Sequence, residues 1–179
     1  MIITLSGKAE CGKDFCSSIM KEYLEELGHK TMIIHQADYL KYICKTYFGW
    51  DGQKDEKGRA LLQYVGTDLV RSKYPNYWVE STLRAILILR DMYEFFLIPD
   101  TRFPNEITLM KFDYSVQSVL VTRPNHINKL TPEQRLHASE TALDNFQFDY
   151  TIVGGEGRDG AYQPTINVVS EILERAYLL

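Results

Sequence analysis

Short apolar runs recur along the chain, separated by longer segments whose apolar residues have helical spacing. This alternation of strand and helix patterns predicts an α/β fold in which helices cover both faces of a parallel sheet. Strands are expected at Ile2–Ser6, Thr31–His35, Phe95–Pro99, Val116–Thr122 and Tyr150–Gly154. Helices are expected at Lys13–Leu27, Asp38–Phe48, Arg59–Lys73, Tyr77–Tyr93 and Pro164–Tyr177, with a loop over Gly49–Gly58 and a short helix starting at Thr131-Pro132-Glu133.

A phosphate-binding motif follows the first strand. Residues 7–14 read Gly-Lys-Ala-Glu-Cys-Gly-Lys-Asp, the glycine-bounded loop, lysine and helix start of a P-loop. Gly7 and Gly12 permit the tight turn that exposes backbone N–H groups, and Lys13 adds a mobile ammonium beside the positive end of a helix. The alternative is a glycine turn with a solvated lysine. We expect ATP phosphates to be held by Gly7, Lys8, Ala9, Glu10, Cys11, Gly12, Lys13, Asp14 and Phe15.

Two carboxylates are candidates for a Mg²⁺ site. Asp14 stands where a P-loop usually carries Ser or Thr, and it could ligate the metal or cap the following helix. Asp100 directly follows the apolar run 95–99. An acid at the end of such a strand can orient Mg²⁺ or its waters, or it can simply cap the following turn.

Composition limits the functional classes. The 179 residues are enough for one domain, 1–179, and the net charge of -4 gives no global basic field for binding a nucleic-acid polymer. The three cysteines, Cys11, Cys16 and Cys44, have no metal-ligand spacing and are interpreted as reduced thiols. No signal peptide or membrane-length apolar stretch is recognised, so a cytoplasmic protein without a membrane partner is expected. Monomer and homodimer both remain open.

Further cations follow the predicted strands, where ligands of parallel sheets bind. Arg102 comes two residues after Asp100, with an ion pair to Asp100 or Glu106 as the alternative role. The segment 59–71 carries two arginines and a glutamine, which suit a second anionic substrate or a solvated helix face. The polar segment 123–140 is interpreted as a mobile lid or as an ordinary surface loop.

These motifs together resemble the deoxynucleoside monophosphate kinases of phages and bacteria, within the nucleoside monophosphate kinase branch of P-loop proteins. Tyr39 stands where that family would carry proline. Animal-type phosphomevalonate kinases also share the Gly-Lys-Asp ending of the P-loop. The resemblance runs through most of the chain and rests on Gly7–Asp14, Ala37-Asp38-Tyr39-Leu40-Lys41, Phe48-Gly49-Trp50, Lys54-Asp55, Leu61-Leu62-Gln63, Gly66-Thr67, Arg71, Asn76-Tyr77-Trp78-Val79, Asp100–Glu106 and His137-Ala138-Ser139-Glu140.

The resemblance implies a P-loop NTPase fold, three-layer α/β/α with a five-stranded parallel sheet, a helical acceptor-binding insertion at about 38–78 and a lid at about 123–140. It implies transfer of the ATP γ-phosphoryl group to a deoxynucleoside 5′-monophosphate, with Mg²⁺ near Asp14 and Asp100. The implied catalytic residues are Lys13, Arg102, Arg123 and Arg135. The implied acceptor-binding residues are Asp38, Lys41, Arg59, Gln63, Thr67, Arg71, Trp78, Arg102 and Glu140. A kinase of another acceptor (phosphomevalonate, a ribonucleotide or dephospho-coenzyme A) and a non-catalytic ATP switch remain alternatives.

Overall fold

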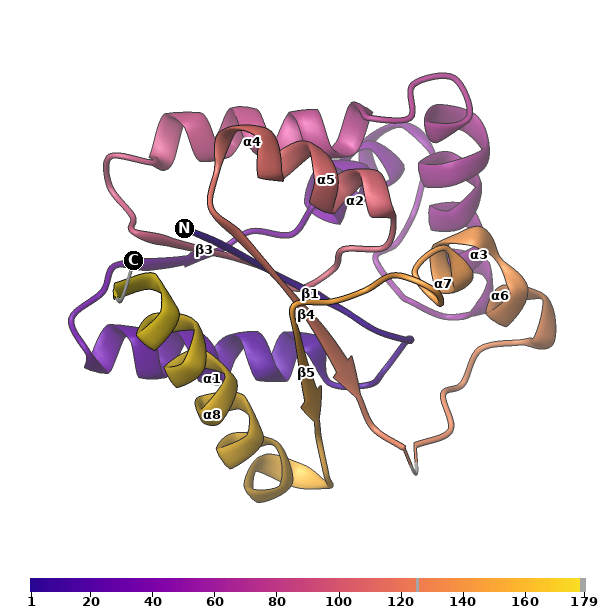
Figure 1. The fold of residues 1–179 in the computed structure, drawn as a ribbon. Coiled ribbons are helices and arrows are strands. Elements are labelled where there is room, and N and C mark those ends of the chain that lie inside the picture. The colour runs from indigo at the N-terminus through magenta and orange to yellow at the C-terminus, as the bar shows by residue number, and fades with distance from the viewer. Residues whose placement is uncertain (125, 178–179) are drawn as a thin grey trace.

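The computed structural model describes residues 1–124 and 126–177. Its centre is a five-stranded parallel sheet with the strand order β2-β3-β1-β4-β5 (Figure 1). The strands are β1 (Ile2–Ser6), β2 (Thr31–Ile33), β3 (Phe95–Ile98), β4 (Val116–Thr122) and β5 (Tyr150–Val153). All five predicted strands are therefore confirmed, although β2, β3 and β5 end earlier than expected.

Helices cover both faces of the sheet. On one face lie α1 and α8, and on the other lie α4 and α5 (Figure 1). The three-layer α/β/α architecture predicted from the sequence is thus confirmed. The helices are α1 (Lys13–Glu26), α2 (Ala37–Tyr47), α3 (Glu56–Gln63), the π-helix η1 (Tyr64–Arg71), α4 (Tyr77–Leu89), α5 (Pro104–Asp113), α6 (Pro132–Leu136), α7 (Ala138–Thr141) and α8 (Gly157–Tyr177).

The central strand β1 contributes to both apolar layers. Every residue of β1 is buried, and successive side chains point to opposite faces. Ile3 and Leu5 join the cluster formed with α1 and α8, whereas Ile2 joins the cluster formed with α4 and α5. Burial on both faces explains why the sequence of this strand is a continuous apolar run rather than an alternation.

The insertion after β2 has its own apolar cluster. Cys44, Trp50 and Val65 are buried together between α2, the loop after it and η1. Gly66 of η1 lies against α2, and a Cβ at this glycine would come within 2.8 Å of a Leu40 methyl group. The absent side chain therefore serves helix packing inside the insertion.

Several helices differ from the sequence expectation, and among them α4 ends at Leu89 rather than at Tyr93. The predicted loop 49–58 ends early, because Asp55 accepts a hydrogen bond from the Gly58 N–H at 2.8 Å and starts α3 at Glu56. The helix α5 was missing from the expectation, although Pro104 at its first position is a helix-start signal. The predicted helix 59–73 is instead α3 followed by the wider turns of η1.

The last helix also begins earlier than predicted, at Gly157 rather than Pro164. A proline inside a helix has no N–H for the carbonyl four residues earlier, which here is that of Gly160. The Gly160 carbonyl instead accepts the N–H of Gly155 at 2.8 Å. The unused acceptor is thereby satisfied, and the helix continues through the proline.

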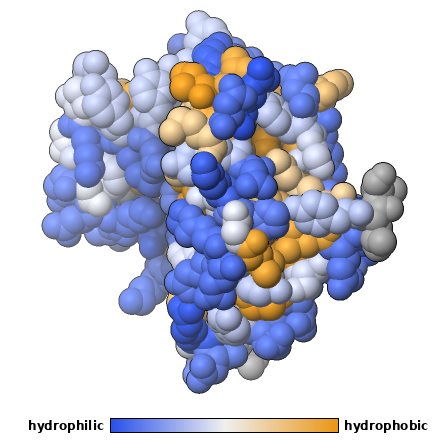
Figure 2. Space-filling view, turned by 90° about the vertical axis from the view of Figure 1, so that its left-hand side faces the viewer, coloured by the Kyte–Doolittle hydropathy of each residue, from blue (hydrophilic) through white to orange (hydrophobic). Residues whose placement is uncertain are grey.

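Within the described residues, no helix is long and apolar enough to cross a membrane. Figure 2 shows one face of the molecule, on which hydrophilic residues separate the apolar patches.

Candidate active site

The phosphate loop connects β1 to α1 and has the backbone of an anion-binding turn. Gly7 has a φ of 146°, and a Cβ there would lie 2.2 Å from the Val121 carbonyl oxygen of β4, so only glycine fits. Gly12 has a φ of 102° and stands at the N-cap of α1 without a side-chain cap. The first N–H groups of α1 are thereby available to an anion at the positive end of the helix.

Lys13 is buried within this loop. Its Nζ donates to the carbonyl oxygens of Gly7 and Lys8 at 2.9 and 2.8 Å. Burial lowers the pKa of Lys13 from its usual 10.5, and the nearby Arg102 charge lowers it further. The loop thus concentrates positive charge in a low-dielectric environment, which favours a bound phosphate.

Asp14 forms a pair with His35, which lies two residues beyond the end of β2. The His35 Nε2 lies 2.9 Å from Asp14 Oδ1, and this hydrogen bond lowers the pKa of Asp14 and raises the pKa of His35. The imidazole Nδ1 lies 3.8 Å from Asp38 Oδ2. The Asp14 side chain therefore reaches the segment that follows β2, a strand separated from β1 by β3.

Asp100 caps the insertion rather than the turn that follows its own strand. Its two carboxylate oxygens accept the N–H groups of Gln36 and Ala37 at 3.0 and 2.9 Å, at the start of α2. An anion at a helix N-terminus is favourable because it meets both free N–H donors and the positive end of the helix dipole. Asp100 thereby attaches the insertion to the end of β3.

A cavity of about 610 Å³ lies between the phosphate loop and the insertion. We call it the insertion cavity. Lys13 and Asp14 line it from α1, while Arg59, Arg71 and Arg102 line it from three other segments. A volume of this size is typical of a small-molecule site. Cations from segments distant in sequence therefore face the same space as the P-loop lysine.

Arg71 is held rigidly at the wall of this cavity. It pairs with Glu106 at 2.5 Å, donates to the Pro75 carbonyl at 3.1 Å, and stacks on the Phe103 ring at 3.9 Å. Glu106 is 3% exposed, and burial raises its pKa while the Arg71 charge opposes that rise. The other oxygen of Glu106 accepts the N–H groups of Arg102 and Phe103. One buried carboxylate thus orients both Arg71 and the loop that carries Arg102.

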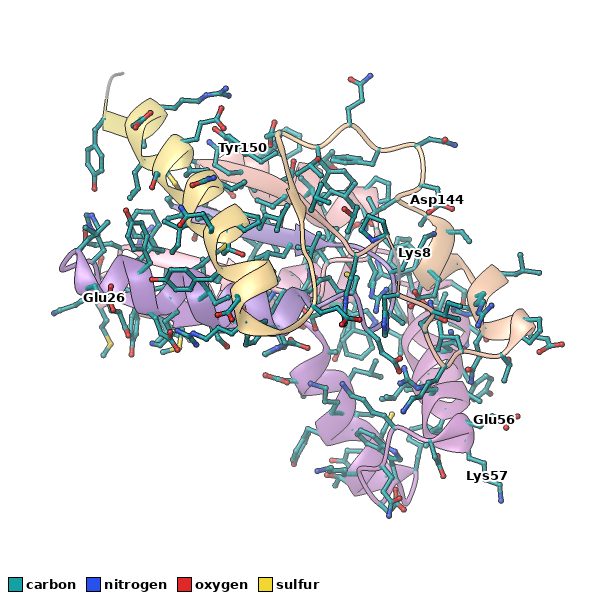
Figure 3. The ribbon with its side chains drawn as sticks, turned by 90° about the horizontal axis from the view of Figure 1, so that it is seen from below. Lys8, Glu26, Glu56, Lys57, Asp144 and Tyr150 are labelled. Atoms are coloured by element: carbon teal, nitrogen blue, oxygen red, sulfur yellow. The ribbon has the colours of Figure 1, made fainter. Side chains whose placement is uncertain are left out.

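The segment 139–144 contacts the phosphate loop directly. Glu140 pairs with Arg102 at 2.7 Å and accepts the N–H of Ala9 at 3.0 Å. Lys8 donates to the Glu140 carbonyl at 2.6 Å and pairs with Asp144; Figure 3 shows Lys8 and Asp144 side by side. Arg102 therefore pairs with Glu140 rather than with Asp100 or Glu106, the two acids considered from the sequence.

A second cavity of about 400 Å³ lies on the other side of the loop, beneath residues 139–148. Arg123 lines it and lies 3.8 Å from Glu156, beyond β5. Arg135 is exposed on α6, where its guanidinium donates to the side chain and the carbonyl of Asn128 at 3.2 and 2.9 Å. In this conformation Arg123 and Arg135 do not face the insertion cavity.

The structure brings most of the predicted site residues together. The insertion cavity is lined by Ala9, Glu10, Lys13, Asp14, Lys41, Arg59, Gln63, Thr67, Arg71, Trp78, Asp100, Arg102 and Glu140. Gly7, Lys8, Cys11 and Arg123 line only the second cavity, and Gly12, Phe15, Asp38 and Arg135 line neither. Trp78 is 4% exposed and donates from its indole N–H to the Gly66 carbonyl at 2.8 Å.

Two residues of this site, His35 and Glu106, have roles that differ from those predicted from the sequence. His35 was placed in a strand, yet a polar residue at the carboxyl end of a parallel strand is a signal for a site. Glu106 was considered only as a partner of Arg102, and its pairing with Arg71 depends on a contact between distant segments.

The loop and its acids fit a magnesium triphosphate. Among residues 1–124 and 126–177, no group of three or more His, Cys, Asp or Glu side chains is arranged to hold a metal ion by itself. Mg²⁺ in phosphate-binding sites uses one or two carboxylates, with phosphate oxygens and waters as the other ligands. Asp14, whose side chain is exposed at the rim of the phosphate loop, suits that role; Asp100 already accepts two N–H groups.

Sheet order and covering helices define a three-layer α/β/α fold, in which a turn of P-loop sequence joins β1 to α1. Solved structures of P-loop kinases share this fold. APS kinase from Mycobacterium tuberculosis has 12% identity and a TM-score of 0.50, with coverage of 97% of this chain and 96% of that chain. Shikimate kinase from Bacteroides thetaiotaomicron has 13% identity and a TM-score of 0.51, with coverage of 97% and 98%. Shikimate kinase from Acinetobacter baumannii, in complex with shikimate, has 11% identity and a TM-score of 0.51, with coverage of 97% and 93%.

At these identities the likeness establishes the fold alone. No family model matches the chain, and no curated protein matches it in sequence. The resemblance to deoxynucleoside monophosphate kinases therefore stays a prediction.

Proposed function

We propose that this protein is a kinase that transfers the γ-phosphoryl group of ATP to a deoxynucleoside 5′-monophosphate. The observation that carries the proposal is the meeting of Lys13 with Arg59, Arg71 and Arg102 around one cavity. A phosphoryl transfer between two phosphorylated substrates must bind two anions close together and neutralise the charge between them. A simple ATP switch needs only the phosphate loop.

The chain supplies positioning and charge. The loop N–H groups and Lys13 would hold the donor phosphates, and Asp14 would hold Mg²⁺, which supplies charge neutralisation when bound. Arg102 lies next to the loop, at 3.3 Å from the Gly7 carbonyl, and would stabilise the transferring group. Arg59 and Arg71, on the insertion, would bind the acceptor phosphate, because a guanidinium presents paired donors to phosphate oxygens.

The wall of the cavity suits an acceptor with a flat apolar part. Leu40, Leu62 and Trp78 lie on the insertion beside Gln63 and Thr67, which offer hydrogen bonds. Such a mixture of apolar surface and a few polar groups is typical of small-molecule sites, and a nucleoside is one ligand that fits it. Together with the motif resemblance, this supports a nucleotide acceptor over an aliphatic one.

The two arginines of the proposed lid could reach the transferring phosphate only if the lid moves. Arg123 and Arg135 lie outside the insertion cavity, so their proposed contact with the transferring phosphate requires the segment 123–140 to close further. Glu140 already touches the loop and Arg102, and we assign it to positioning that arginine beside the acceptor.

The test is ADP release measured against deoxynucleoside and ribonucleoside monophosphates, phosphomevalonate and dephospho-coenzyme A, each with MgATP. We expect at least one deoxynucleoside monophosphate to give the highest kcat/KM. A preference for another acceptor would show that the acceptor was assigned wrongly, while the proposed kinase activity would still stand. If no acceptor accelerates ATP consumption while MgATP still binds, the switch interpretation is correct instead.

A further inference from the structure

One carboxylate at the tip of the phosphate loop joins the insertion to the lid. Glu10 Oε1 accepts a hydrogen bond from Nη2 of Arg59, on α3, at 2.8 Å. Its Oε2 accepts the backbone N–H of Lys129 at 3.2 Å and lies 3.7 Å from Nε2 of His126. The two oxygens of Glu10 therefore contact two segments that are more than sixty residues apart in the sequence.

The backbone at this position is unusual. Glu10 has a φ of 63°, and within residues 1–124 and 126–177 it is the one residue other than glycine with a positive φ. Residues other than glycine adopt a positive φ only at a conformational cost, and residues in this strained conformation concentrate at functional sites. A glycine at residue 10 would adopt this φ freely. The turn can therefore form without a glutamate, and the contacts of the Glu10 side chain serve another purpose.

The guanidinium of Arg59 is fixed from two sides. Its Nε donates to the Lys54 carbonyl at 3.0 Å, while its Nη2 binds Glu10. The side chains of Arg59 and Glu10 are 25% and 28% exposed, so this pair is partly shielded from water. A partly exposed pair adds little to global stability but does define where the arginine lies.

We propose that Glu10 is a positioning residue, which holds Arg59 toward the insertion cavity and holds the start of the lid, residues 126–129, over the phosphate loop. One residue of the phosphate loop thereby couples the position of the acceptor-side arginine to the closure of the lid. The structural part of this inference stands without any assumption about activity; its kinetic part rests on the proposed function.

The structural part is tested by amide hydrogen exchange on the full chain without nucleotide. Glu10→Gln keeps the shape of the side chain and removes its charge, and Glu10→Gly removes the side chain while relieving the backbone. The control is Glu22→Gln, which breaks a more exposed ion pair between α1 and Arg158 of α8. We expect exchange to rise about fivefold in both segments, 54–63 and 126–131, in the two Glu10 variants, and to stay unchanged in the control.

Glu10→Gly separates positioning from general destabilisation. Because glycine tolerates this φ, we expect its Tm to equal or exceed that of Glu10→Gln, even though exchange in both segments rises. A lower Tm for Glu10→Gly, with exchange rising throughout the chain, would show a structural role only. Unchanged exchange in both segments, or a rise confined to one of them, would overturn the coupling.

The kinetic part compares KM with kcat. We expect Glu10→Gln to raise the KM for the acceptor about fivefold and to change the Kd for MgATP less than about twofold, because the loop N–H groups and Lys13 remain in place. If the wild type phosphorylates no acceptor but the exchange result holds, the proposed function fails and the role of Glu10 stands. An active enzyme whose Glu10→Gln variant has an unchanged acceptor KM contradicts the role.

Discussion

Replacing Arg71 by methionine tests the buried pair at the wall of the insertion cavity. The substitution keeps a long side chain that can pack on Phe103 but removes the charge that faces Glu106. Since Glu106 is 3% exposed, its carboxylate would lose the guanidinium that pairs with it while remaining out of water. Breaking such a pair from one side costs roughly 3–5 kcal/mol.

The structure places the expected loss near the lower end of that range. Glu106 keeps the N–H donors of Arg102 and Phe103, so its negative charge is still partly stabilised. We therefore expect Arg71→Met to lower the free energy of unfolding by about 3 kcal/mol at pH 7. For a chain of this length that corresponds to a fall in Tm of roughly 6–12 °C.

The pH dependence has a definite sign. Burial raises the pKa of Glu106 above its usual 4.5, and removing Arg71 takes away the main opposing influence. A buried acid with a raised pKa binds more protons when folded, so stability is lost as the pH rises from about 4.5 through that raised value. The penalty of Arg71→Met is consequently expected to be smaller at pH 5 than at pH 7.

Urea unfolding followed by tryptophan fluorescence and circular dichroism measures this penalty, with the m-value checked for two-state behaviour. The matched control is the double variant Arg71→Met with Glu106→Gln, in which neither member of the pair is charged and the amide oxygen can still accept a backbone N–H. We expect the double variant to recover at least about half of the lost stability. A loss below about 1 kcal/mol in the single variant, or no recovery in the double, would refute the reasoning.

Three further outcomes are expected. Lys13→Ala should lower kcat at least about 100-fold while the protein stays folded, because it removes a buried cation from the phosphate site; kinetics and a melting curve measure both. Arg135→Ala should lower kcat about tenfold or more and leave the Kd for ATP within about twofold if the lid closes, whereas full turnover would remove Arg135 from the mechanism. Because the pKa of His35 is raised in the folded protein, its stabilising contribution is complete below pH 6.5 and is lost as the pH rises through that raised pKa. The lowered pKa of Asp14 acts in the opposite direction, and its contribution is lost at acid pH. Melting curves in EDTA should therefore show that His35→Gln destabilises the protein more at pH 6 than at pH 8; an equal effect at both would contradict the pairing.

The sheet was readable from the sequence because its signals are local. A buried parallel strand is a continuous apolar run, and the P-loop keeps its glycines and lysine within eight residues. Helix α5 carried a local signal as well, in Pro104, but the segment was interpreted only as the polar end of a strand. The start of α8 depended on the Gly155–Gly160 hydrogen bond, which compensates Pro164 and is visible only in three dimensions.

The partners of the site arginines were harder to predict. Sequence spacing suggested Asp100 or Glu106 for Arg102, yet Glu140, thirty-eight residues away, is the acid that pairs with it. Long side chains reach partners on any neighbouring segment, so the pairing depends on how the insertion and segment 139–144 pack against the loop. The residue types of the site were therefore predictable, while their pairings were not.

The separate apolar cluster of the insertion has an evolutionary consequence. Cys44, Trp50 and Val65 form a small core that shares no buried member with the two clusters on the sheet, and Asp100 fastens the insertion to β3 through backbone N–H groups. Substitutions inside this small core can reshape the wall of the insertion cavity while Lys13 and the strand before it keep their places. A lineage can thus change which ligand this cavity accepts by substitutions in one segment, without any change to the sheet or the phosphate loop.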